Sequence, residues 1–134
     1  MVIGIDHIGI AVEKLDEAIH LYRDILNLKL EGIKIADEDK VKTAFFSTGG
    51  ETRIELMEPT EANSPVAKFI EKKGEGIHHI SLKVNNIENF LETLKAKGLK
   101  LVDEKPRMGA EGVKVAFIHP RSTRRVLFEL CEKP

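Results

Sequence analysis

The chain lacks the sequence features that disulfide-bonded, nucleic-acid-binding, membrane-spanning and secreted proteins require. Its single cysteine, Cys131, excludes an intramolecular disulfide. Its formal net charge is −1 with both signs interspersed, so it offers no basic stripe for a phosphate backbone. It has no apolar run near the roughly 20 residues that span a bilayer and no basic signal-peptide segment at its start. We therefore expect a cytoplasmic protein that binds neither nucleic acid nor membrane.

Glycine-rich phosphate-binding motifs, with the spacing of a dinucleotide-binding fold or a P-loop, are missing too. With 134 residues, 42% hydrophobic and 32% charged, the chain is long enough for one domain with a hydrophobic core. A second independent domain is not expected.

What the sequence does contain is an internal repeat. Three stretches of the first half return in the second half in the same order, two of them 72 positions later and one 74 positions later. They are Gly4–Ile8 with Gly76–Ile80, Val41–Phe46 with Val113–Ile118, and Ile54–Leu56 with Phe128–Leu130. A shared order at nearly one offset predicts a duplication, with an insertion of two residues in one loop.

Each half follows the pattern of a strand, a helix and three further strands. Apolar residues alternate after His7 and after His79, as in half-buried strands, and then recur at helical spacing over 15–25 and 87–94. Further strands are predicted over 28–35, 41–47 and 53–57 in the first half, and over 100–104, 113–118 and 126–131 in the second. The predicted fold class is α+β, with two tandem βαβββ modules forming a curved eight-stranded mixed sheet.

We expect one domain over residues 1–134, made of module one (1–59), a connecting helix (60–74) and module two (75–134). Ser64 followed by Pro65 is typical of a helix start, and Gly74 is typical of a helix end. The connecting helix therefore has a signal at each terminus.

Four residues at matching positions of the two modules are candidate metal ligands. His7 and His79 leave the apolar faces of their strands, and Glu55 and Glu129 each lie between apolar neighbours that point the other way. Alone, such a histidine is more often structural and such a carboxylate more often solvated. A sheet curled around its helix-free side would bring the four together, and two buried carboxylates require a positive charge. The set suits one divalent cation with open positions, so we predict a metal site inside the curved sheet.

Several other polar residues have simpler interpretations. His20 is expected on a solvated helix surface and His78 at a strand end, and nothing near Cys131 favours a nucleophile. For His119, which precedes Pro120, turn formation and substrate contact are equally open. The loop over 109–112, with basic residues nearby, is either a mobile cationic loop over an anionic ligand or a plain surface hairpin; those basic residues are Lys105, Arg107 and Lys114.

Paired modules with these residues resemble the vicinal oxygen chelate superfamily, and within it most closely the methylmalonyl-CoA epimerases. The resemblance covers nearly the whole chain. Its more specific parts are the connecting helix that runs into His78-His79 and the His119-Pro120 segment. The similar stretches are 6–12, 54–59, 64–69, 74–80, 115–120 and 126–130.

The resemblance implies an isomerase that interconverts (R)- and (S)-methylmalonyl-CoA by α-proton abstraction through an enediolate. It implies that His7, Glu55, His79 and Glu129 bind a divalent cation (Co, Mn, Ni, Zn or Mg) that chelates the substrate, with Glu129 as a catalytic acid or base. It also implies a homodimer.

The sequence departs from relatives at three places. Some epimerases carry Gln at the position of Glu55, and some carry a second catalytic glutamate near Thr43. Relatives often have small residues where this chain has Arg124-Arg125, a change that bears either on coenzyme A contacts or only on the surface.

Three alternatives share the superfamily. Glyoxalase I uses two His and two Glu, which these positions match equally well, although the connecting helix and His119-Pro120 argue against it. A metal-free small-molecule-binding resistance protein is a second alternative, but such proteins tend to lose the ligands. Extradiol dioxygenases are usually longer and richer in aromatic residues, whereas this chain has six Phe, one Tyr and no Trp.

Overall fold

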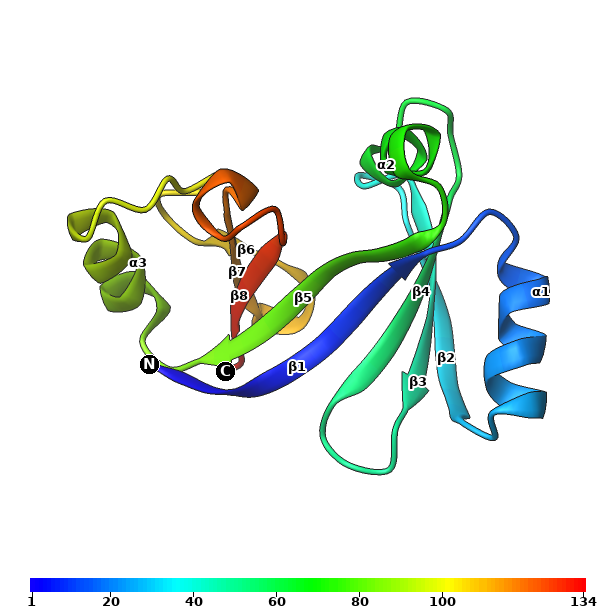
Figure 1. Ribbon diagram of the computed structural model, residues 1–134. Helices are drawn as coiled ribbons and strands as arrows, with labels where there is room; N and C mark the ends of the chain where they lie inside the picture. The colour runs from blue at the N-terminus through cyan, green and yellow to red at the C-terminus, as the bar shows by residue number, and fades with distance from the viewer. The chain divides into compact units, whose positions relative to one another are not determined.

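Strands and helices follow one another in an order that occurs twice along the chain (Figure 1). The computed structural model describes residues 1–134, except for the side chain of Ala110. Its first half contains β1 (Val2–Ala11), α1 (Leu15–Ile19), η1 (His20–Ile25), β2 (Lys29–Ala36), β3 (Val41–Ser47) and β4 (Arg53–Pro59). Helix α2 (Pro65–Lys73) leads to β5 (Gly76–Val84), α3 (Ile87–Ala96), β6 (Arg107–Met108), η2 (Ala110–Gly112), β7 (Lys114–Ile118), η3 (Pro120–Ser122) and β8 (Phe128–Glu132). These elements confirm the α+β class and the two βαβββ modules.

The chain folds as two compact units that share strands β1 and β5. The first unit is His7–His78, and the second unit is Met1–Asp6 with His79–Pro134. In the first unit β1 pairs in parallel with β4, and β4, β3 and β2 then pair antiparallel. In the second unit β5 pairs in parallel with β8, and β8, β7 and β6 then pair antiparallel. Over the described residues the chain thus has eight strands of mixed direction, as predicted.

The register of the strands repeats as the sequence does. Ile8 lies opposite Ile54 in the first unit, and Ile80 lies opposite Phe128 in the second. Glu55 and Glu129 are each the next residue along their strand, opposite Gly9 and Ser81. The two parallel pairs therefore align at the sequence offsets of 72 and 74 positions.

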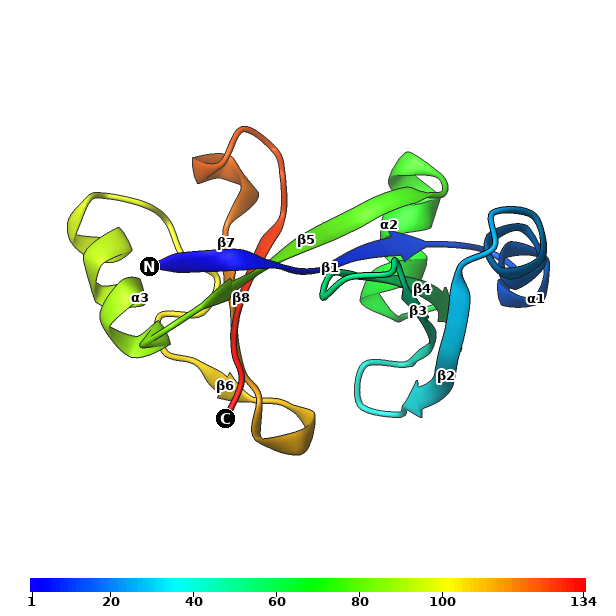
Figure 2. The ribbon, with the colours of Figure 1, turned by 90° about the horizontal axis from the view of Figure 1, so that it is seen from below.

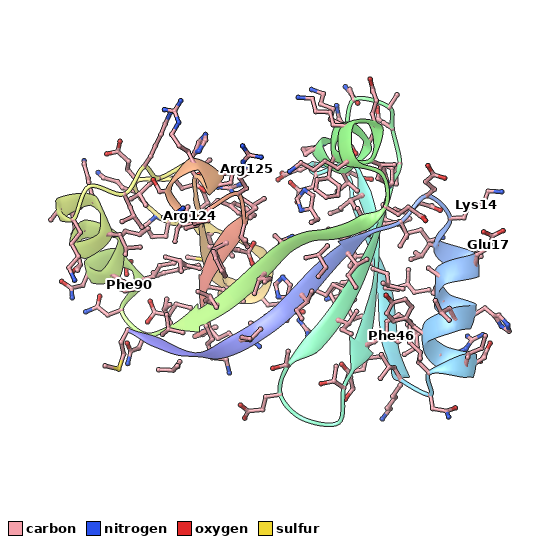
Figure 3. All side chains as sticks on the ribbon, viewed as in Figure 1. Lys14, Glu17, Phe46, Phe90, Arg124 and Arg125 are labelled. Carbon is pink, nitrogen blue, oxygen red and sulfur yellow. The ribbon has the colours of Figure 1, made fainter. Side chains whose placement is uncertain are left out.

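Each unit has a hydrophobic core between its sheet and one helix. The cores contain six buried residues each, and every member of one core has its counterpart in the other at an offset of 72 or 74 positions. Figure 3 shows the largest of them, Phe46, pointing from β3 toward α1. The cores are Val12, Leu15, Ile19, Ala44, Phe46 and Leu56 in the first unit, and Val84, Ile87, Leu91, Ala116, Ile118 and Leu130 in the second.

A matched pair of carboxylates caps the helix that follows the first strand of each module. Glu58 accepts a hydrogen bond of 2.9 Å from the Leu15 N–H at the start of α1. Glu132 accepts bonds of 2.8 and 2.9 Å from the N–H groups of Asn86 and Ile87 at the start of α3. These bonds lower the pKa of Glu132. A negative charge at a helix N-terminus stabilises the helix, so the fold uses the same long-range cap twice.

The connecting helix forms as predicted. Ser64 Oγ accepts a bond of 3.0 Å from the Ala67 N–H, and Gly74 ends α2 with a φ of 77°. Leu56 and Met57, neighbours on β4, point to opposite faces, so Leu56 packs with α1 and Met57 with Val66 of α2. Figure 2 shows α1 and α2 on different sides of the first unit's strands.

Two sequence-based expectations need correction. The helix over 15–25 changes to π-helical hydrogen bonding at η1, where the Leu26 N–H donates to Leu21 O at 2.9 Å. The predicted strand over 100–104 is wrong, because only Leu101 bridges β7 there, and the edge strand is β6 instead. The cause is the side chain of Asp103, which accepts the Phe117 N–H at 2.8 Å and so occupies the donor that a strand partner would use.

Candidate metal centre

In the first unit a histidine and a glutamate meet on the face of the sheet opposite α1. His7 Nδ1 lies 3.4 Å from Glu55 Oε2, and both residues are buried, with 9% of their surface exposed. They come together because β1 and β4 are parallel neighbours. The pair therefore combines one imidazole and one carboxylate at a buried position.

Arg53 contacts the same carboxylate oxygen as His7. Its Nη2 lies 3.3 Å from Glu55 Oε2, and its guanidinium stacks over the ring of Phe45 at 5.2 Å. Arg53 precedes Glu55 by two residues on β4, so both side chains leave the same face. Arg53 was not among the predicted site residues, although the period of two along a strand could have indicated it.

In the second unit the corresponding histidine and glutamate also lie close together. A ring nitrogen of His79 and a carboxylate oxygen of Glu129 are within 4.8 Å of each other. The ring of His79 packs edge-on against Phe117, with ring centroids 6.0 Å apart. His79 is buried, whereas Glu129 is half-buried. Glu129 is therefore the more accessible of the two carboxylates.

The surroundings of the two glutamates repeat as well. Phe45 lies opposite Glu55 in the β3–β4 pair, and Phe117 lies opposite Glu129 in the β7–β8 pair. A cation from the neighbouring edge strand lies over each phenylalanine ring, Lys34 at 5.9 Å in the first unit and Arg107 at 5.8 Å in the second. The position that matches Arg53 is Leu127, so this arginine belongs to one half only.

The donor set fits a divalent metal ion. Two ligand atoms that each lie about 2.1 Å from one ion are about 3 Å apart, and the His7–Glu55 separation of 3.4 Å is close to this value. Imidazole nitrogen and carboxylate oxygen are ordinary ligands of first-row divalent cations. Each unit therefore brings together one imidazole nitrogen and one carboxylate oxygen that could bind such a cation, His7 with Glu55 and His79 with Glu129.

The other three histidines have structural partners. His20 is exposed and pairs with Asp24 at 2.9 Å; bonds from Arg23 and then His20 lower the pKa of Asp24 to about 2. His78 packs edge-on against Phe69 at 5.0 Å, and its pKa is lowered by burial and by Lys73. The exposed side chain of His20 confirms the prediction that it lies on a solvated helix surface.

Turn formation accounts for His119, since its Nδ1 accepts a bond of 3.0 Å from the Arg121 N–H and caps η3. Cys131 is buried, and burial raises the pKa of its thiol, which keeps it protonated and weakly reactive. Asp6, which was not among the predicted site residues, is buried and pairs with Lys133 Nζ at 2.8 Å in the second unit.

Residues 6–117 match the family model of the Glyoxalase/Bleomycin resistance protein/Dioxygenase superfamily. The chain belongs to this superfamily. Among similar curated proteins, YqjC of Bacillus subtilis, an uncharacterized protein, is 45% identical over 96% of this chain and 91% of its own length. The mitochondrial methylmalonyl-CoA epimerase of Dictyostelium discoideum is 36% identical over 96% of this chain and 78% of its own length. The ethylmalonyl-CoA/methylmalonyl-CoA epimerase of Cereibacter sphaeroides is 36% identical over 97% of this chain and 98% of its own length.

The chain is also similar to several solved structures. The hypothetical protein BH1468 from Bacillus halodurans is 47% identical, with a TM-score of 0.92 over 97% of this chain and 94% of that one. The methylmalonyl-CoA epimerase of Mycobacterium tuberculosis is 36% identical, with a TM-score of 0.91 over 99% of this chain and 89% of that one. A methylmalonyl-CoA epimerase in complex with methylmalonyl-CoA and NH4+ is 32% identical, with a TM-score of 0.89 over 99% and 96% of the two chains.

These comparisons confirm the resemblance read from the sequence and the prediction of an isomerase of the epimerase class. Among the described residues, no helix is both long and apolar enough to cross a membrane.

Proposed function

We propose that the protein is a metal-dependent methylmalonyl-CoA epimerase that inverts the configuration at C2. The observation that carries this proposal is the 36% identity to the Cereibacter sphaeroides epimerase over 97% of this chain and 98% of that one. The matched His–Glu pairs of the two units support it, because imidazole nitrogen and carboxylate oxygen are groups that bind divalent cations. We propose that His7, Glu55, His79 and Glu129 together hold one divalent cation.

The proposed roles of the residues follow from their surroundings. A bound divalent cation would supply Lewis-acid stabilisation of the negative charge that develops on the substrate oxygens. His7 and Glu55 are buried, and Arg53 holds Glu55 in place, so this pair acts as a fixed support. Glu129 is half-buried and accessible, so it is the carboxylate that removes the C2 proton from one face of the substrate.

Inversion requires proton delivery to the opposite face. Thr43, near the position where some relatives carry a second glutamate, is buried on β3 opposite Met57. A threonine hydroxyl does not ionise near neutral pH, so Thr43 cannot replace a carboxylate as a general base. The second acid or base of the proposed reaction is therefore not Thr43.

Glyoxalase I remains the second candidate because two His and two Glu also form its ligand set. Lactoylglutathione lyase GLX1 of Arabidopsis thaliana is 27% identical over 95% of this chain and 43% of its own length. The match is weaker than the epimerase matches, so we place this activity second. The homodimer implied by the resemblance and the cytoplasmic location expected from the sequence stay predictions. Sedimentation of the purified protein tests the first, and cell fractionation tests the second.

Isotope exchange tests the proposed function. When the metal-supplemented protein is incubated with methylmalonyl-CoA in deuterated water, we expect deuterium at C2, measured by mass spectrometry. Protein treated with a chelator is the control and should exchange little. If the protein instead isomerises the hemithioacetal of methylglyoxal and glutathione, and leaves C2 of methylmalonyl-CoA unexchanged, the glyoxalase assignment replaces the epimerase.

A further inference from the structure

A tight turn with two arginines precedes β8 in the second unit. Arg124 and Arg125 both have positive φ, 59° and 72°, and the Val126 N–H donates to Thr123 O at 3.4 Å across them. Thr123 Oγ1 also donates to Val126 O at 2.5 Å. Positive φ at both central residues is typical of a type I′ turn, in which Asn-Gly is the preferred pair. Two arginines are an unfavourable choice for this backbone, because their Cβ atoms disfavour the left-handed region.

Positive charge gathers around this turn. Backbone and side-chain bonds join residue 100 to the turn region: His119 N–H donates to Lys100 O at 3.0 Å, and Lys100 N–H to Ser122 Oγ at 2.8 Å. No Asp or Glu occurs in the sequence between Glu111 and Glu129. The cationic residues of this region are Lys100, Arg121, Arg124 and Arg125.

Within the part of the chain that the structure describes, none of these four cations forms an ion pair. Other cations of the same unit do, with Lys95, Lys114 and Lys133 paired to Glu104, Glu88 and Asp6. Arg124 and Arg125 are exposed, and Figure 3 shows them on the turn that leads into β8. Their guanidinium groups are thus available to an anion, and a guanidinium binds phosphate oxygens through paired N–H donors.

We propose that the Arg124-Arg125 turn binds the phosphate groups of a coenzyme A thioester, with its acyl end at Glu129. This inference rests on the proposed function. The turn is joined directly to the strand that carries Glu129, four residues further along the chain. Four residues of extended chain span about 13 Å. The phosphates of such a substrate are separated from its acyl group by a long arm, so one end can meet the turn while the other reaches Glu129.

The proposal explains why the turn keeps an unfavourable sequence. If the arginines contributed only to the fold, an Asn-Gly pair would form a more stable turn. Replacing the arginines with Asn-Gly would then stabilise the protein and have no other effect. If they bind phosphate, the same replacement stabilises the fold and weakens binding. The two effects have opposite signs, which separates a binding role from a structural role.

The test compares Arg124→Asn/Arg125→Gly with the wild type. By calorimetry we expect the Kd of free coenzyme A to rise at least about tenfold, while the Kd of pantetheine, which carries no phosphate, stays the same. We also expect the KM of methylmalonyl-CoA to rise by a similar factor with kcat within about twofold, and the melting temperature to rise. Arg124→Lys/Arg125→Lys should retain part of the affinity, because charge remains without the planar fork.

Lys40→Gly is the matched control. Lys40 has a φ of 55° in the turn of the first unit, so this variant also relieves a positive-φ residue and removes a cation. Its affinity for coenzyme A should equal that of the wild type. An unchanged coenzyme A affinity in the double variant, or equal weakening for coenzyme A and pantetheine, would overturn the inference.

The binding assay also separates this inference from the proposed function. Arginine-dependent binding of coenzyme A without exchange at C2 would support phosphate binding by the turn and contradict the proposed epimerase activity. Exchange at C2 with an unaltered KM in the double variant would support the proposed epimerase activity and contradict phosphate binding by the turn.

Discussion

Glu129→Gln should remove almost all deuterium exchange at C2 of methylmalonyl-CoA, lowering kcat by about a hundredfold or more, because a positioned general base contributes about 10²–10⁴-fold. The amide cannot accept the C2 proton, although it keeps the size of the carboxylate. Glu129 is only half-buried, so substitution should leave the Leu130 core and the fold intact. Circular dichroism and thermal melting check the fold, and mass spectrometry measures the exchange.

The matched control is the same substitution at the counterpart residue. Glu55 is buried between His7 and Arg53, and we assign it a supporting role. Glu55→Gln should therefore retain exchange within about tenfold of the wild type, since an amide oxygen still occupies the ligand position. Undiminished exchange by Glu129→Gln would remove this residue from the mechanism, whatever Glu55→Gln does.

The second large effect concerns metal affinity. His79→Ala should weaken binding of a divalent cation by more than about a hundredfold, since loss of a group that only supports a ligand already costs about 10–100-fold. Competition with a fluorescent chelator measures the affinity directly and needs no substrate.

The neighbouring histidine provides the control for this variant. His78 packs against Phe69 in the first unit, and burial lowers its pKa. His78→Ala should change metal affinity less than about threefold, although it loses the contact with Phe69. Were His78→Ala to release the metal while His79→Ala kept it, the assignment within the histidine pair would be reversed.

Local patterns predicted the parts of the fold that depend on near neighbours. Strand β3 has the predicted bounds, and α2 starts after Ser64 and ends before Gly74 as expected. Alternation, helical spacing and capping act within a few residues, so a single sequence carries them. The matched cores confirm the repeat, because each residue of the first core has a counterpart in the second at an offset of 72 or 74 positions.

The errors arose where a distant group decides the local structure. Asp103 takes the Phe117 N–H, and this bond between residues 14 positions apart prevents a strand over 100–104. Glu58 and Glu132 cap helices more than 40 positions away, which no local capping pattern indicates. Such contacts become visible only when the pairing of the strands is known.

The candidate site also has features that the sequence predicted and features that it did not. The parity of each strand placed Glu55 on the face opposite Leu56, and this is where it meets His7. The stacking of cations on Phe45 and Phe117 depends on pairing between strands, which local patterns do not show. The support from Arg53 lies within one strand, two residues before Glu55, and the period of two could have indicated it. The repeat thus predicted which residue types meet within each unit, but not what holds them in place.

Counting metal ions per chain tests the central claim most directly. If His7, Glu55, His79 and Glu129 share one cation, equilibrium dialysis followed by elemental analysis should find one ion per chain in the wild type. The variants His7→Ala/Glu55→Ala and His79→Ala/Glu129→Ala should then each bind almost none. Two ions per wild-type chain, with one retained in each double variant, would show separate sites and contradict the account.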